Sequence, residues 1–173
     1  VHNGIIENFK ELRSQLAAEG RTFESETDSE VIAHLVSSRI EAGMDPIEAV
    51  KAVLVRLRGA FALAIAFRSH PDLLIGARLG SPLVVGYGPE GEEREMYLGS
   101  DALALAPLTQ RISYLEEGDW VVIGRSGAQV FDAENNPVER EIRASGASAA
   151  AVEKGNYRHF MQKEIFEQPT VVA

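Results

Sequence analysis

The sequence predicts an α+β fold, because three segments with helical periodicity come first and a run of strand-like segments follows. Apolar residues recur every three or four positions up to residue 57, and from residue 60 onward large apolar residues alternate with smaller or polar ones. The helices precede the strands instead of alternating with them, which favours antiparallel sheets over a parallel one. At 173 residues, the chain has the length of one domain with a sizeable core.

The first predicted helix follows a turn. Val1-His2 is expected to end a strand, and Asn3-Gly4 to form a tight turn, because Gly tolerates positive φ and Asn tolerates the left-handed region better than most residues. A helix is predicted over about residues 5–19, since apolar positions fall on one face. Gly20 is placed to end it as the residue after the C-cap.

The next two helices carry start signals. Thr27 and Glu30 fit a capping box, with Thr27 as N-cap and Glu30 at N3, and an apolar stripe continues to about residue 42. Asp45-Pro46 fits the N-cap and first position of the third helix.

The second half predicts strands separated by turn residues. Segment 60–67 alternates large residues with alanines and is apolar on both faces, so we expect it to be covered on both sides. A turn at 69–72, a solvated hairpin tip at 91–95 and a short helical turn at 101–105 interrupt the series. The other predicted strands are 73–79, 83–87, 96–98, 112–115, 120–123, 129–131 and 138–142.

Composition excludes several classes of function. A net charge of −9 argues against nucleic acid as a partner, and no apolar run approaches the length of a membrane span. The chain has no cysteine, which rules out disulfides and thiolate metal sites within it and is compatible with a cytoplasmic location. No two histidines have the spacing of a zinc site, so we expect no metal.

Asn3 and Gly4 also suggest chemistry. A side-chain amide beside a Gly N–H offers two hydrogen-bond donors to one point, which suits the oxyanion that forms in acyl transfer. Taken alone, an Asn-Gly pair is best explained as no more than a turn. The surrounding motifs favour the chemical interpretation.

Six motifs occur in order along the chain: His2–Asn8 (HNGIIEN), 25–31 (SETDSEV), 57–62 (LRGAFA), 80–86 (GSPLVVG), 115–119 (LEEGD) and 157–169 (YRHFMQKEIFEQP). As a set they resemble the glutaminase domain of the glucosamine-6-phosphate synthases, which are N-terminal-nucleophile hydrolases. The first motif would also suit another class II amidotransferase, such as an amidophosphoribosyltransferase, whereas the last favours the synthase branch.

The resemblance implies an αββα sandwich, with two face-to-face antiparallel sheets and outer helices, here truncated at its N-terminus. It implies three parts: a partial glutaminase domain over residues 1–143, a flexible Ala/Ser/Gly-rich segment over 144–156, and over 157–173 the start of a linker toward an absent sugar isomerase domain. The implied substrates are L-glutamine and, through the isomerase domain, fructose 6-phosphate. We expect a cytoplasmic homodimer that uses no cofactor.

The site residues follow from matching positions. Asn3 and Gly4 match the family's oxyanion hole. Asp28 and Gly4 match residues that bind glutamine, and Asp28 matches the carboxylate that binds its α-ammonium group. An Asp near a helix start is often a helix cap, and the two roles of Asp28 can coexist. His2 is expected to give a supporting hydrogen bond. Tyr157, Arg158 and His159 match the interdomain linker.

The family's nucleophile is an N-terminal cysteine, and this chain has none, so the fragment is expected to be inactive. A non-catalytic glutamine-binding regulatory module is the alternative.

Overall fold

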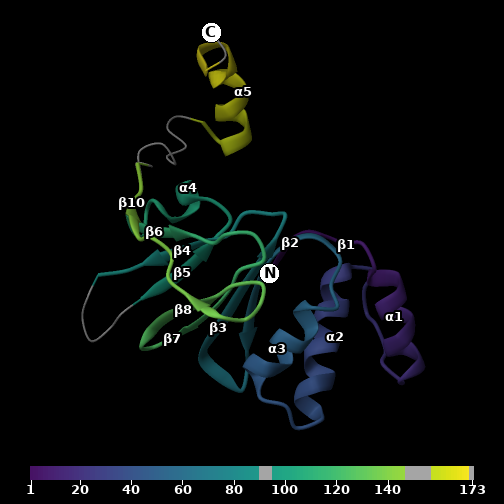
Figure 1. Cartoon of the computed structure of the whole chain (residues 1–173). Helices are drawn as coiled ribbons and strands as arrows, with labels where there is room; N and C mark the ends of the chain where they lie inside the picture. The colour runs from purple at the N-terminus through teal and green to yellow at the C-terminus, as the bar shows by residue number, and fades with distance from the viewer. Residues whose placement is uncertain (90–94, 147–156, 172–173) are drawn as a thin grey trace.

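The computed structural model describes residues 1–89, 95–146 and 157–171, and in it two antiparallel sheets pack face to face (Figure 1). The six-stranded sheet has the order β1-β2-β3-β7-β8-β9 and the four-stranded sheet the order β10-β6-β4-β5. The helices are α1 (Phe9–Ala18), α2 (Asp28–Glu41), α3 (Pro46–Leu54), α4 (Ala102–Leu105) and α5 (Phe160–Val171). The strands are β1 (His2–Ile6), β2 (Gly59–Phe67), β3 (His70–Leu79), β4 (Val84–Tyr87), β5 (Met96–Gly99), β6 (Arg111–Tyr114), β7 (Trp120–Gly124), β8 (Gly127–Phe131), β9 (Pro137–Val138) and β10 (Arg143–Ala144).

Three apolar cores separate four layers. Leu35 of α2 and Val50 of α3 belong to the core between the helices α1–α3 and the six-stranded sheet. Val85 of β4 and Val121 of β7 belong to the core between the two sheets. A smaller core joins the four-stranded sheet to α4, where Leu105 is buried. The predicted αββα layering is therefore confirmed.

Strand β2 lies at the centre of this arrangement. Its side chains alternate between two cores, with Phe61 and Leu63 facing the helices and Ala62 facing the second sheet. The prediction of a strand covered on both faces is confirmed at these residues. The next strand, β3, begins at His70, three residues earlier than predicted, because Phe67 and His70 pair across the two-residue turn between them.

The predicted turn at Asn3-Gly4 is wrong. Both residues lie within β1, which pairs antiparallel with β2, and the chain turns only at residues 7–8. Asn8 fastens this turn, because its side-chain amide donates to the Arg56 carbonyl and accepts from the Arg58 N–H. The first helix therefore begins at Phe9 instead of about residue 5.

The starts of α2 and α3 are confirmed. Thr27 is the N-cap of α2, and Asp45 is the N-cap of α3. The Asp45 carboxylate accepts from the Ile47 N–H at 2.9 Å, as the N-cap pattern predicts. Gly20 follows the C-cap of α1 at φ +91°, also as predicted.

The predicted strand over 138–142 is wrong. β9 ends at Val138 in the six-stranded sheet, and β10 begins at Arg143 in the four-stranded sheet. Between them, the Arg140 guanidinium binds the buried Asp119 carboxylate in a bidentate pair with N–O distances of 2.7 and 2.9 Å. This pair holds the chain where it passes from one sheet to the other.

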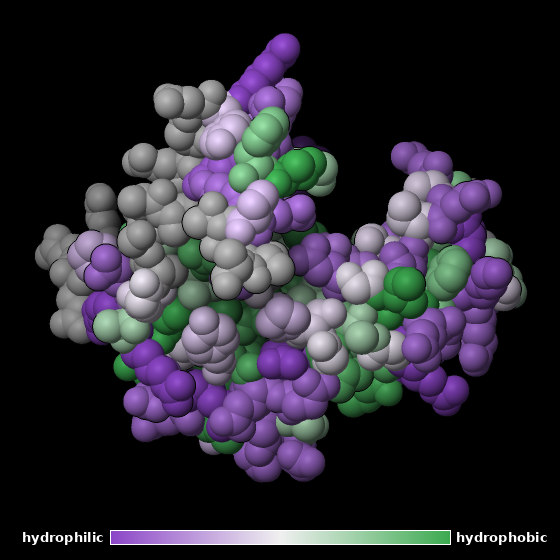
Figure 2. All heavy atoms as spheres, turned by 90° about the horizontal axis from the view of Figure 1, so that it is seen from above, coloured by the Kyte–Doolittle hydropathy of each residue, from purple (hydrophilic) through white to green (hydrophobic). Residues whose placement is uncertain are grey.

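Helix α5 is the last described element. The helical pattern that begins near residue 157 predicts a helix that ends at Pro169, but α5 continues through this proline, so that prediction is wrong. Exposed apolar side chains occur along it, among them Met161 and Phe166, which are 71% and 64% exposed. In the view of Figure 2, apolar residues appear in groups among polar ones.

Two predicted segments cannot be compared with the structure. Residues 90–94, most of the predicted hairpin tip, and residues 147–156, most of the Ala/Ser/Gly-rich segment, lie outside the described residues. Ala144, in β10, pairs with Arg111 of β6. The predicted division of the chain at residue 143 remains a prediction. Within the described ranges, no helix is long and apolar enough to cross a membrane.

Candidate active site

Asn3 and Gly4 lie in the middle of β1, an edge strand of the six-stranded sheet. Both are exposed, so a ligand can reach the Asn3 amide and the Gly4 backbone. Gly4 has φ +109°, and a Cβ at this position would stand 2.1 Å from the Ala60 carbonyl oxygen. Only glycine fits this close approach of β1 to β2.

Asp28 is the first residue of α2, and its side chain faces β1. Its Oδ2 accepts from the Ile6 N–H at 2.9 Å, and its Oδ1 lies 3.4 Å from the His2 Nδ1. The N-terminus of a helix also favours a negative charge at this position. Asp28 therefore contacts β1 on both sides of Asn3-Gly4, and the three predicted site residues come together.

His2 supplies part of this contact. Its side chain is 4% exposed, and its Nδ1 lies 3.1 Å from the Ser29 Oγ. Its other ring nitrogen, Nε2, is buried and has no hydrogen-bond partner. The expectation that His2 gives a supporting hydrogen bond agrees with this geometry, although the sequence did not indicate Ser29 as its partner.

Glu30 organises the loop that leads into α2. Its carboxylate accepts from the Glu24 and Ser25 N–H groups and from the Ser25 hydroxyl. These bonds, first that of the Ser25 hydroxyl and then that of the Glu24 N–H, lower the Glu30 pKa to about 2. The predicted capping box is wrong, because Thr27 makes no side-chain cap bond and Glu30 binds residues farther back in the loop.

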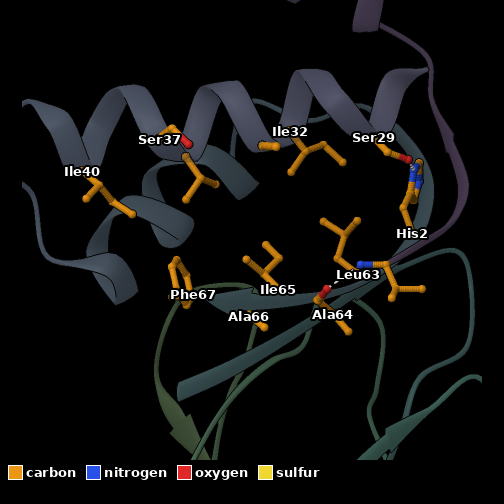
Figure 3. A pocket seen from close by; sticks show the side chains of 13 residues that line it. His2, Ser29, Ile32, Ser37, Ile40, Leu63, Ala64, Ile65, Ala66 and Phe67 are labelled. Atoms are coloured by element: carbon orange, nitrogen blue, oxygen red, sulfur yellow. Dashed lines mark hydrogen bonds between the residues drawn. The ribbon is translucent and has the colours of Figure 1, made fainter. Parts of the chain in front are cut away.

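A cavity of about 350 Å³ lies beside these residues, between α2 and β2 (Figure 3). His2 and Ser29 stand at one end of it, and most of the remaining lining is apolar, including Ile32, Leu63 and Phe67. Among the described residues, no three His, Asp or Glu side chains gather as the ligands of a metal ion would.

The predicted linker residues, Tyr157, Arg158 and His159, lie just before the start of α5. Tyr157 stacks on Phe166 of α5, with ring centroids 5.9 Å apart. Arg158 and His159 are exposed and lie just before α5. Their assignment to an interdomain linker stays a prediction.

Comparison with known proteins identifies the family. Residues 1–107 match the family described as glutamine amidotransferase domain. The chain belongs to this family. Its residues 1–173 are 69% identical to glutamine–fructose-6-phosphate aminotransferase (isomerizing) of Zymomonas mobilis and 59% identical to the protein of the same name from Brucella suis. The chain spans 28% of the length of these relatives.

Solved structures agree with the fold of this amidotransferase domain. Glutamine phosphoribosylpyrophosphate amidotransferase from B. subtilis matches with a TM-score of 0.63 and 27% identity, covering 79% of this chain and 29% of that one. A structure titled as the allosteric regulatory enzyme of purine biosynthesis matches with a TM-score of 0.62 and 27% identity, covering 78% of this chain and 28% of that one. The predicted class II amidotransferase fold is therefore confirmed.

Proposed function

We propose that this amidotransferase domain is the glutamine-hydrolysing part of a longer polypeptide that makes glucosamine 6-phosphate and glutamate from fructose 6-phosphate and glutamine. The observation that carries the proposal is the contact of Asp28 with β1 on both sides of Asn3-Gly4. The two contacts are with Ile6 and His2, and each of these residues is two positions from Gly4. Two positions along a strand correspond to about 7 Å, a distance that one glutamine molecule can span.

In this reaction, the residues of this chain would bind glutamine and stabilise the oxyanion of the tetrahedral intermediate. The Asp28 carboxylate pairs with the α-ammonium of glutamine. The Asn3 amide and the Gly4 N–H donate to the carbonyl oxygen, most strongly once it carries the negative charge of the tetrahedral intermediate. A thiolate attacks the amide carbon, the proton that the thiol gave up is transferred to the departing nitrogen so that ammonia leaves, and water then hydrolyses the thioester to glutamate and the free thiol. That thiolate comes from elsewhere in the polypeptide, since this chain has no cysteine.

The sugar substrate rests on the relatives. Their printed name pairs glutamine with fructose 6-phosphate, and the Zymomonas mobilis protein is 69% identical to this chain over its residues 1–173. The matched phosphoribosylpyrophosphate amidotransferase is 27% identical, which favours the aminotransferase branch over that alternative. The proposal includes a homodimer, a cytoplasmic location where free glutamine and sugar phosphates are found, and residues 157–173 as the start of the interdomain linker.

Expression of the full-length protein tests this function. Purified enzyme should release glutamate from glutamine and form glucosamine 6-phosphate only when fructose 6-phosphate is present. The gene upstream of Val1 offers a simpler check, because an open frame that begins Met-Cys-Gly supports the enzyme. A full-length protein that binds glutamine without hydrolysing it would favour the regulatory module instead.

A further inference from the structure

The side chain of His2 contacts one part of the proposed glutamine site, Asp28, and its backbone adjoins the other part, Asn3-Gly4. It belongs to β1, immediately before Asn3, yet its ring contacts the first turn of α2 (Figure 3). One nitrogen, Nδ1, is 3.1 Å from the Ser29 Oγ and 3.4 Å from the Asp28 Oδ1. The ring is therefore placed to act on Asp28 from the same strand that carries the oxyanion donors.

The position of the proton on this ring follows from its neighbours. If Nδ1 carried no hydrogen, its lone pair would face the negatively charged Asp28 oxygen, an unfavourable arrangement. A hydrogen on Nδ1 is instead shared between the Ser29 hydroxyl and the Asp28 carboxylate, and both contacts become attractive. The unpartnered nitrogen Nε2 then needs no hydrogen.

We propose that His2 is a positioning residue that orients Asp28 toward the ammonium group of glutamine, an inference that rests on the proposed function. Asp28 receives one hydrogen bond from the Ile6 N–H and a second, longer contact from the His2 Nδ1–H. Both donors belong to β1. They fix the carboxylate to the strand that carries Asn3 and Gly4, so the ammonium site and the oxyanion site keep their separation.

Two variants of His2 distinguish the roles of its two ring nitrogens. In His2→Asn, the amide stands near the place of Nδ1, whereas in His2→Gln it stands near the place of Nε2. In the full-length enzyme, His2→Asn should keep a KM for glutamine close to that of the parent. His2→Gln should raise it roughly tenfold, as expected when a polar contact with a charged group is lost, with kcat changed less than threefold. A merely structural histidine would give two similar variants, and that result, or a loss confined to kcat, would overturn the proposal.

A measurement on the 173-residue chain needs no activity. Nitrogen NMR of ¹⁵N-histidine-labelled protein distinguishes the tautomers of the ring, and the signal missing from His2→Asn identifies His2. We expect a proton on Nδ1. A neutral ring protonated only at Nε2 would overturn the proposal, because Nδ1 could not then donate to Asp28.

The two failures are distinguishable. If Asp28→Asn in the full-length enzyme leaves KM for glutamine unchanged, the proposed role of Asp28 fails whatever the NMR result. If Asp28→Asn raises KM but His2→Gln does not, only the positioning role of His2 is wrong.

Discussion

Replacing Gly4 by alanine tests the close contact between β1 and β2. The residue has φ +109°, and the added Cβ would stand 2.1 Å from the Ala60 carbonyl oxygen. Alanine in the left-handed region costs about 1–2 kcal/mol. The backbone shift that relieves the contact costs about 1–3 kcal/mol more. Gly4→Ala should therefore lower the free energy of unfolding by about 2–5 kcal/mol.

Gly20→Ala is the matched control. Gly20 also has positive φ, at +91°, but a Cβ there would meet nothing within 4 Å. Both substitutions restrict the unfolded chain in the same way, so the difference between them isolates the contact with Ala60. Urea denaturation of the 173-residue chain should show Gly4→Ala less stable than Gly20→Ala by about 1–3 kcal/mol, at unchanged m-value. Equal stabilities would refute the close approach of the two strands.

Four further predictions concern activity and acid stability. The 173-residue chain should release no glutamate from glutamine, because it has no thiol, and release above a buffer control would contradict this. In the full-length enzyme, Asn3→Ala should lower kcat roughly 100- to 1000-fold, whereas Asp28→Asn should mainly raise KM for glutamine; the reverse pattern would exchange their roles. Glu30 has a folded pKa of about 2, below its usual 4.5, so its contribution to stability is present above pH 4.5 and is lost as the pH falls toward 2. Urea titrations should show a weaker acid dependence in this window for Glu30→Gln, and identical pH profiles would argue against the bonds to Ser25. Replacing Arg158 and His159 together in the full-length enzyme should preserve glutamine hydrolysis but uncouple it from glucosamine 6-phosphate formation, and a parallel loss of both activities and of the melting temperature would place them in the core.

Local signals in the sequence were sufficient where a short segment determines its own structure. The Asp45-Pro46 pair starts α3 because the aspartate caps the helix and the proline lacks an N–H that the first position does not need. The alternating pattern of β2 predicted burial on two faces, because successive side chains of a strand point to opposite sides. The αββα layering itself came from the family resemblance, since periodicity alone does not say how two sheets stack.

Long-range contacts account for the errors. Asn-Gly is a turn signal over four residues, but β1 pairs with β2 more than fifty residues later, and this pairing keeps Asn3 and Gly4 within the strand. The alternation over 138–142 is typical of a strand, yet the ion pair of Arg140 with Asp119 interrupts it. The local sequence pattern around Arg140 does not indicate its buried partner, Asp119, which lies about twenty residues earlier.

The site shows why a helix start can be misread. Asp28 follows an N-cap position, so the sequence is compatible with a capping role beside the binding role. In the structure, both of its carboxylate oxygens face β1: one accepts from the Ile6 N–H, and the other lies beside the His2 ring. Thr27, at the N-cap itself, makes no side-chain bond to the helix. The polar side chains at this helix start therefore join α2 to β1, and the joined pair holds Asp28 next to Asn3-Gly4.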